Sequence, residues 1–247
     1  MPDKEAFERA RIKVVNSTRQ QLGIGTLSEK AVHAVLKNYY DPNEDHQEIP
    51  IDNYVADIYA YGQITEIQTR QLGRLRDKLK TFLPQYQVTV VHPIILEKYL
   101  ICTDKKTGLL AKKRKSPKKQ TVYDAFPEFY QIRMFLKDPN LKLKLALINL
   151  EEYRLVNYGD WDISRASSTF DQVPSALVEE VEINCLQDYM QFVPSELVGP
   201  FNSRTFAKAA KISIELSQKV LNVLYNVGIL TRVGKEGNLY LYEVLNI

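Results

Sequence analysis

Residues 54–69 of this chain read YVADIYAYGQITEIQT, in which two β-prone runs flank a Tyr-Gly turn. Two such runs joined by a two-residue turn predict a β-hairpin. This turn pairs Ala60 with Gln63. Counting outward, Asp57 then faces Glu66 across the ladder, and strand alternation puts Gln68 on that same face. Because directly opposed carboxylates destabilise a sheet, the hairpin predicts a positive charge between them, and hard divalent cations bind such oxygen ligands.

The pattern of an apolar residue, Asp57, a turn and then Glu66-Ile67-Gln68 resembles the metal-binding hairpin of the restriction-endonuclease-like superfamily, the PD-(D/E)XK nucleases. Members of that superfamily usually carry lysine at the position of Gln68, and glutamine is a variation within it. Helix signals at 28–39 and 71–83 and a strand signal at 87–91 surround the hairpin. Their order resembles the superfamily core.

A broader resemblance covers most of the chain. The Glu-Ile-Gln-Thr run at 66–69 with the basic helix after it, the RKSPKK segment at 114–119 and a Gly-x-x-Gly near the end resemble an uncharacterised bacterial family. That family is expected to join a nuclease core to a winged helix. The resemblance implies an α/β fold with a restriction-endonuclease-like core (a mixed sheet flanked by helices) over 1–175, followed by a small winged-helix domain over 176–247.

The resemblance to the nucleases also implies the chemistry. The expected activity is hydrolysis of DNA phosphodiester bonds by a Mg²⁺- or Mn²⁺-dependent deoxyribonuclease. Asp57, Glu66 and the backbone carbonyl of Ile67 would hold the metal ion. The alternative is that Asp57 is a strand-end acid and Glu66 a surface residue paired with Arg70 or Lys78. Gln68 would orient the attacking water through its amide but would supply no charge.

Two more side chains are candidates for this site. Lys78 lies on the helix that follows the hairpin, where some superfamily members carry their lysine, and Arg70 and Arg74 are the alternatives to it. Glu29 lies on the apolar side of the helix that precedes the hairpin, a position from which superfamily members supply an extra acid. The alternative for Glu29 is a helix-start glutamate that interacts with the N-terminal dipole.

The segment Lys105–Lys119 has the highest density of positive charge, with eight basic residues in fifteen. A flexible solvated loop is one interpretation. The other is a clamp on the DNA backbone, since phosphate contacts supply most non-specific affinity. The residues expected to bind nucleic acid here are Lys112, Lys113, Arg114, Lys115, Lys118 and Lys119.

The last third of the chain changes to a helical pattern. Helices are predicted at 186–193, 203–210 and 214–227, with Ser213 as the N-cap and Gly228 as the terminator of the last one. A hairpin from 229 to 244 follows, and this order resembles a winged helix. Its expected DNA contacts are Gln218, Lys219, Asn222 and Lys235; binding of a protein partner is the alternative.

The other segments have weaker patterns. A polar loop is predicted at 41–50, a helix at 3–21 and another helix at 121–136. Strands are predicted at 95–102, 141–149 and 153–161, with a turn at 150–152 between the last two, and a polar link is predicted at 164–174.

Composition sets broad limits. The chain has 247 residues, 45% of them hydrophobic, and a net charge of only +3. Two cysteines and three histidines, all far apart in sequence, argue against a zinc site and against a disulfide framework. The absence of a signal-like or membrane-spanning run favours the cytoplasm. DNA is the expected partner, no membrane is expected, and a homodimer is left open. The alternative function is a non-catalytic DNA-binding or assembly protein on a decayed nuclease core.

Overall fold

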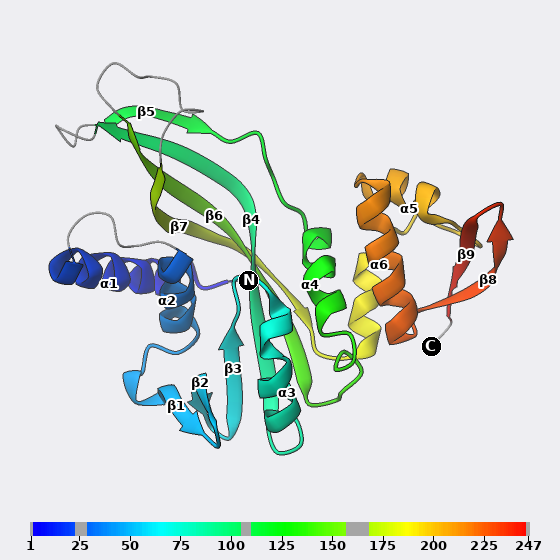
Figure 1. Ribbon diagram of the computed structural model, residues 1–247, viewed down its shortest axis with the longest axis horizontal. Helices are drawn as coiled ribbons and strands as arrows, with labels where there is room; N and C mark the ends of the chain where they lie inside the picture. The colour runs from blue at the N-terminus through cyan, green and yellow to red at the C-terminus, as the bar shows by residue number, and fades with distance from the viewer. Residues whose placement is uncertain (1, 23–28, 105–109, 157–167, 246–247) are drawn as a thin grey trace.

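The computed structural model describes residues 2–22, 29–104, 110–156 and 168–245. Within them the chain forms a mixed α/β structure, with helices on both faces of one large mixed sheet (Figure 1). The strand order is β1-β2-β3-β4-β6-β7, and β5 also pairs with β4. The strands are β1 Gln47–Ile51, β2 Tyr54–Ala60, β3 Gln63–Ile67, β4 Gln87–Asp104, β5 Leu110–Lys115, β6 Leu141–Val156 and β7 Ser168–Ile183.

The hairpin of β2 and β3 has the predicted register. Ala60 pairs with Gln63, and Ile58 pairs with Thr65. Tyr61 and Gly62 at the turn both have positive φ angles, 51° and 77°. Positive φ at both central residues is the turn geometry whose twist matches that of the two strands. The strand β3 then runs parallel to β4, which places the hairpin beside the middle of the sheet.

Three strands are longer than the sequence pattern predicted. The strand β4 is continuous where two separate strands were expected. The strand β6 runs through the turn predicted at 150–152, and β7 occupies most of the predicted link at 164–174, so both of those predictions are wrong. The charged residues that resembled a turn are paired across the sheet instead: Glu151 with Lys113 and Glu152 with Lys98. Residues 157–161 of the strand predicted at 153–161 lie outside the described residues.

Two strands were not predicted. The strand β1 lies in the segment expected to be a polar loop, and it pairs with β2 at the edge of the sheet. Its proline is compatible with that position, because an edge strand leaves one row of N–H groups unpaired. The strand β5 contains much of the basic segment and pairs with the second half of β4.

The helices bury two apolar cores against the two faces of the sheet. Helices α1 (Lys4–Leu22) and α2 (Glu29–Tyr40) cover one face, with Phe7, Val35 and Leu36 among the buried residues. The 3-10 helix η2 (Leu72–Leu75) and helix α3 (Arg76–Phe82) cover the other, in place of the single helix predicted at 71–83. The predicted helix at 121–136 is likewise a 3-10 helix, η3 (Val122–Ala125), followed by a short helix, α4 (Phe126–Gln131).

The C-terminal elements follow the predicted order. They are the 3-10 helix η5 (Leu186–Phe192), helices α5 (Ser203–Ala210) and α6 (Ile214–Val227), and the hairpin of β8 (Leu230–Glu236) and β9 (Leu239–Val244). Ser213 caps α6 and Gly228 ends it at φ 92°, as predicted. The expected domain boundary after residue 175 falls inside β7, so the sheet continues to Ile183. No helix in the described part of the chain is long and apolar enough to cross a membrane.

Candidate functional site

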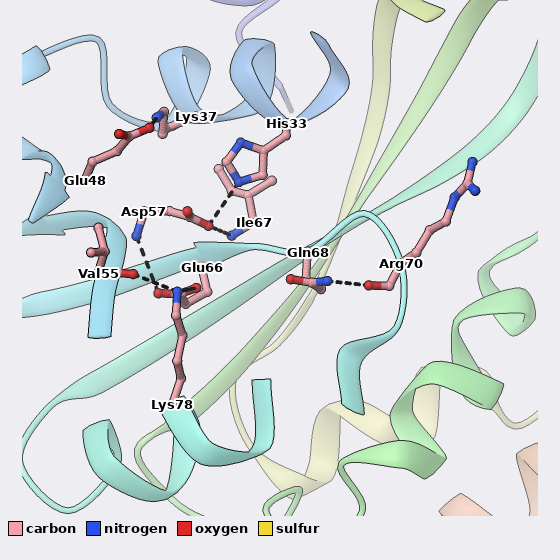
Figure 2. Close-up of polar contacts among 10 residues, drawn as sticks. All are labelled: His33, Lys37, Glu48, Val55, Asp57, Glu66, Ile67, Gln68, Arg70 and Lys78. Carbon is pink, nitrogen blue, oxygen red and sulfur yellow. Dashed lines mark hydrogen bonds and ion pairs between the residues drawn. The ribbon is translucent and has the colours of Figure 1, made fainter. Parts of the chain in front are cut away.

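The two hairpin acids meet where β2 and β3 separate. Beyond the Ile58–Thr65 pair, side chains replace the ladder bonds: Asp57 Oδ2 accepts the Ile67 N–H at 2.8 Å. The backbone N–H of Asp57 in turn donates to Glu66 Oε1 at 3.4 Å. In Figure 2 the Asp57 carboxylate lies toward His33 of α2, and the Glu66 carboxylate lies toward Lys78 of α3. The hairpin therefore brings Asp57 and Glu66 near each other, but not as the predicted cross-strand pair on one face: the ladder stops at Ile58–Thr65, and the two acids contact helices on opposite faces of the sheet.

Lys78 reaches this gap from α3. Its Nζ donates to Glu66 Oε2 at 2.8 Å and to the Val55 carbonyl at 2.7 Å (Figure 2). The Glu66 side chain is only 2% exposed, while that of Lys78 is 23% exposed, so the lysine closes the site toward solvent. Lys78 therefore contacts Glu66, a contact that fits both the predicted catalytic cation and the alternative of a simple Glu66–Lys78 ion pair, and its role in catalysis stays a prediction.

Helix α2 supplies a histidine that the sequence analysis did not single out. His33 Nε2 lies 3.2 Å from Asp57 Oδ2. One turn later, Lys37 Nζ lies 2.6 Å from Glu48 Oε1. The available signal was spacing, because His33 and Lys37 follow Glu29 at successive i+4 positions on the side of α2 that faces the hairpin.

The two carboxylates differ in proton affinity. Burial, together with the nearby charge of Asp57, raises the pKa of Glu66 to about 7. Burial also acts to raise the pKa of Asp57, but the hydrogen bond and charge of His33, the Ile67 N–H and the Lys78 charge together lower it below its ordinary value. Near neutral pH, Asp57 is therefore ionised while Glu66 can hold a proton.

Gln68 points away from the carboxylates. Its side-chain amide donates to the backbone carbonyl of Arg70, beyond the end of β3 (Figure 2). The backbone carbonyl of Gln68 accepts a hydrogen bond from His92 Nδ1 at 2.7 Å. The expected face-sharing of Gln68 with Glu66 gives no hydrogen bond between Gln68 and the acids, because β3 ends at Ile67 and the backbone turns there.

Two other expected contributors have no described contact that would establish their role. Glu29 is the first residue of α2, and its side chain lies outside the described residues. Ile67 contacts Asp57 through its N–H rather than through its carbonyl. No group of three or more His, Cys, Asp and Glu side chains is arranged to hold a metal ion among the described residues.

The basic strand β5 is partly neutralised by acids. Lys113 lies 3.0 Å from Glu151, and Lys115 pairs with Glu97. Both lysines also lie over the ring of Tyr99. Arg114, Lys118 and Lys119 are exposed, and the side chain of Lys112 lies outside the described residues. The segment from 110 to 115 is thus a paired strand rather than a flexible loop.

The residues expected to bind DNA on α6 and β8 lie at the other end of the molecule from β5 (Figure 1). Gln218 and Lys219 are exposed and Asn222 is half-buried. Lys219 pairs with Glu215 at 3.1 Å, and Lys235 lies 4.8 Å from the centre of the Tyr240 ring. These side chains do not converge with Asp57 and Glu66.

Comparison with known proteins gives a family but no activity. A family described as "Domain of unknown function (DUF8091)" matches residues 30–184, a span that includes the hairpin and ends one residue after β7. A protein of Treponema pallidum (strain Nichols), titled "Uncharacterized protein", is 33% identical over 129 residues. That alignment covers 52% of this chain and 51% of the relative, so the chain spans about half of the relative's length. No solved structure matches.

The family match covers more than half of the chain, from the first turn of α2 to the end of β7. It therefore includes His33, Asp57, Glu66 and Lys78 and excludes α5, α6, β8 and β9. The chain belongs to the DUF8091 family.

Proposed function

We propose that the protein is a metal-dependent nuclease that hydrolyses DNA phosphodiester bonds at the split between β2 and β3. The observation that carries the proposal is the meeting of Asp57, Glu66 and Lys78, which come from three different elements. Two carboxylates and an ammonium group in one gap match the requirements of phosphoryl chemistry: ligands for a cation, and a fixed charge for the phosphate.

The oxygen donors suit Mg²⁺. This ion is usually held by only one or two carboxylates, and water and substrate phosphate oxygens complete its shell. Asp57 and Glu66 would provide the carboxylates, and the carbonyl of Ile67 is the candidate third protein ligand. When bound, Mg²⁺ or Mn²⁺ would polarise the scissile phosphate and lower the pKa of a coordinated water.

The protein side chains have separate roles in this proposal. Glu66 must release the proton that its raised pKa allows it to hold before it can serve as a ligand. Lys78 would shift from Glu66 to a phosphate oxygen and stabilise the charge that develops there. His33 would hold the Asp57 carboxylate in its orientation through the 3.2 Å contact.

We assign the C-terminal elements, from α5 to β9, to a winged-helix module that contacts DNA or a protein partner. The order of helix, turn, helix and two-stranded hairpin supports this assignment. The exposed face of α6, with Gln218 and Lys219, and Lys235 on β8 would be the contacting groups.

A plasmid-nicking assay with Mg²⁺ or Mn²⁺ tests the activity. The wild-type protein should convert supercoiled DNA to the nicked form, and Asp57→Asn and Glu66→Gln should each abolish the reaction. Asp77→Asn is the matched control, because Asp77 is an exposed acid on α3 one residue before Lys78. Equal nicking by the Asp57→Asn protein and the wild type would refute the proposal.

A second candidate is a non-catalytic DNA-binding or assembly protein on a decayed nuclease core. The orientation of Gln68 favours it, since its amide contacts the Arg70 carbonyl instead of a water at the acids. This alternative expects DNA binding that is unchanged in Asp57→Asn and no nicking by any of the proteins.

A further inference from the structure

A cavity of about 290 Å³ lies beside the candidate site, past the end of β3. The strand β4 pairs with β3 up to Val91, and with β5 only from Tyr99 onward. Its edge between these two points is uncovered by either strand, and His92, Pro93 and Ile95 there line the cavity. In open α/β sheets, crevices beyond the carboxyl ends of strands are the usual places for ligands.

One part of the cavity wall is apolar, and the rest, which includes Thr69, Arg70 and Gln172, is polar or charged. Val32 from α2 lies on one side, and Pro93, Ile148 and Leu150 from the sheet contribute the floor. All four side chains are buried. These apolar side chains favour a ligand with an apolar ring face over a highly hydrated one.

Hydrogen-bonding groups from the η3–α4 segment line the same cavity. Asp124 uses Oδ2 to accept from the N–H and hydroxyl of Thr121. Glu128 uses Oε2 to accept from the N–H of Leu72 and the amide of Gln131. These contacts use one oxygen of each carboxylate, and Asp124 Oδ1 and Glu128 Oε1 are the oxygens that would accept from a ligand.

His92 adds a third acceptor. It is 6% exposed, and its Nδ1 lies 2.7 Å from the Gln68 backbone carbonyl, which can only accept a hydrogen bond. Burial lowers the pKa of His92, so the neutral ring with a proton on Nδ1 is the form present near neutral pH. Its Nε2 is then an acceptor.

We propose that this cavity is a subsite for a nucleobase that carries an exocyclic amino group, cytosine or adenine. Carboxylates accept hydrogen bonds from such amino groups, as Asp and Glu do from cytosine N4. The lining holds two carboxylates against one guanidinium, that of Arg70, and this net negative charge disfavours a phosphate inside the cavity. The ligand's phosphate therefore remains outside, while its base enters between Val32 and the sheet.

The cavity lies close to the proposed nuclease site, and this part of the inference rests on the proposed function. Gln68 is two residues beyond Glu66, about 7 Å along an extended chain, and its carbonyl contacts His92 in the cavity wall. A base turned out of a strand into this cavity would leave its phosphate near the two carboxylates, as in enzymes that extrude a nucleotide. The base subsite would then select where the DNA is cut.

Methyl NMR of the intact protein in EDTA tests the subsite without requiring cleavage. Titration with dCMP should shift the methyl signals of Val32, Ile95 and Ile148 in a saturable way. The signal of Ile183, which lines a separate cavity, should stay in place. Titration with dTMP, which has the same charge but no amino group, should need roughly tenfold more ligand. Absence of saturable dCMP shifts at the three cavity methyls would overturn the proposal.

The variant Glu128→Gln tests the recognition chemistry. A glutamine can still accept from the Leu72 N–H with its carbonyl, but it turns an amino donor toward the cavity. The preference for dCMP over dTMP should therefore fall from about tenfold to about onefold, because thymine presents a carbonyl acceptor. The control is Glu179→Gln on the exposed surface of β7, which should keep the wild-type preference. A Glu128→Gln protein that folds and keeps the full preference would contradict the assignment of Glu128.

A competition experiment distinguishes the two sources of such a base. An eight-residue deoxycytidine oligomer that displaces dCMP from the cavity methyls assigns the subsite to a base within a strand. Failure of the oligomer to displace dCMP assigns it to a free nucleotide. Saturable dCMP binding in EDTA by a protein that never nicks DNA would support the subsite and refute the nuclease activity. The two proposals can therefore fail independently.

Discussion

Lys78 Nζ and Glu66 Oε2 lie 2.8 Å apart, and Nζ also donates a hydrogen bond to the backbone carbonyl of Val55 on the hairpin. A lysine from one helix thus occupies the place where a cation would bind a strand carboxylate. The pair couples three properties of the site: its charge, its affinity for metal and the proton on Glu66.

Replacement of Lys78 by methionine should separate binding from turnover. Methionine keeps most of the packing of the lysine stem and removes the charge. We expect turnover to fall by roughly 10²–10³-fold, the effect of removing one electrostatic stabiliser of a transition state, while DNA affinity changes little. Single-turnover cleavage rates and filter binding measure the two effects. Lys80→Met, at an exposed position on the same helix, is the control, and full activity in Lys78→Met would move the role to Arg70 or Arg74.

Glu66 should make the protein less stable as pH rises. Its pKa in the folded state is about 7 against 4.5 for an ordinary glutamate, so the folded state binds more protons between these values. Stability contributed by the protonated form is complete below about pH 4.5 and is lost as pH rises through 7. The full effect is on the order of 3 kcal/mol. Urea unfolding at pH 5 and pH 8 should show a smaller loss for Glu66→Gln than for wild type, with Glu243→Gln as the exposed control; equal losses in all three would refute this.

Mg²⁺ should stabilise the wild-type protein against heat. A ligand that binds only the folded state adds about 1.4 kcal/mol when its free concentration is ten times Kd. The melting temperature should therefore rise by roughly 3–6 °C. Differential scanning fluorimetry should show no such rise for Asp57→Asn or Glu66→Gln. The shift should also be larger in Lys78→Met, because the lysine no longer competes for Glu66, and a smaller shift there would contradict this competition.

Neutralising the basic strand should weaken DNA binding for all sequences alike. Replacing Lys112, Lys113, Arg114 and Lys115 by glutamine should reduce the slope of log K against log salt by about 0.9 for each DNA phosphate that the protein no longer neutralises. Since Lys113 and Lys115 already pair with Glu151 and Glu97, we expect the change in slope to correspond to fewer phosphates than the number of charges removed. Binding isotherms at several salt concentrations measure the slope. An unchanged slope would show that β5 has no part in DNA binding.

The sequence predicted the hairpin, its register and the last two helices because local rules govern them. A two-residue turn sets the pairing of Ala60 with Gln63, and Ser213 and Gly228 mark the ends of α6. The same register brought Asp57 close to Glu66, although the ladder stops one pair short of them. These features depend on residues that are close together in the chain.

The features that were missed depend on residues that are far apart in sequence. The strand β6 passes through Glu151 and Glu152 because lysines from β5 and β4 neutralise them. His33 reaches Asp57 only after α2 packs against the sheet. Neither contact leaves a local signal, since each acid or histidine alone resembles an ordinary surface residue.

The C-terminal elements are attached through packed rings rather than through a tether. The ring centroids of Phe192 and Phe126 of α4 lie 5.1 Å apart, and those of Phe206 of α5 and Tyr123 of η3 lie 6.1 Å apart. A chain cut after residue 184, where the family match ends, would leave these rings of η3 and α4 facing water. If α6 binds DNA and the hairpin cleaves it, as proposed, this packing would fix the distance between the binding site and the cleavage site.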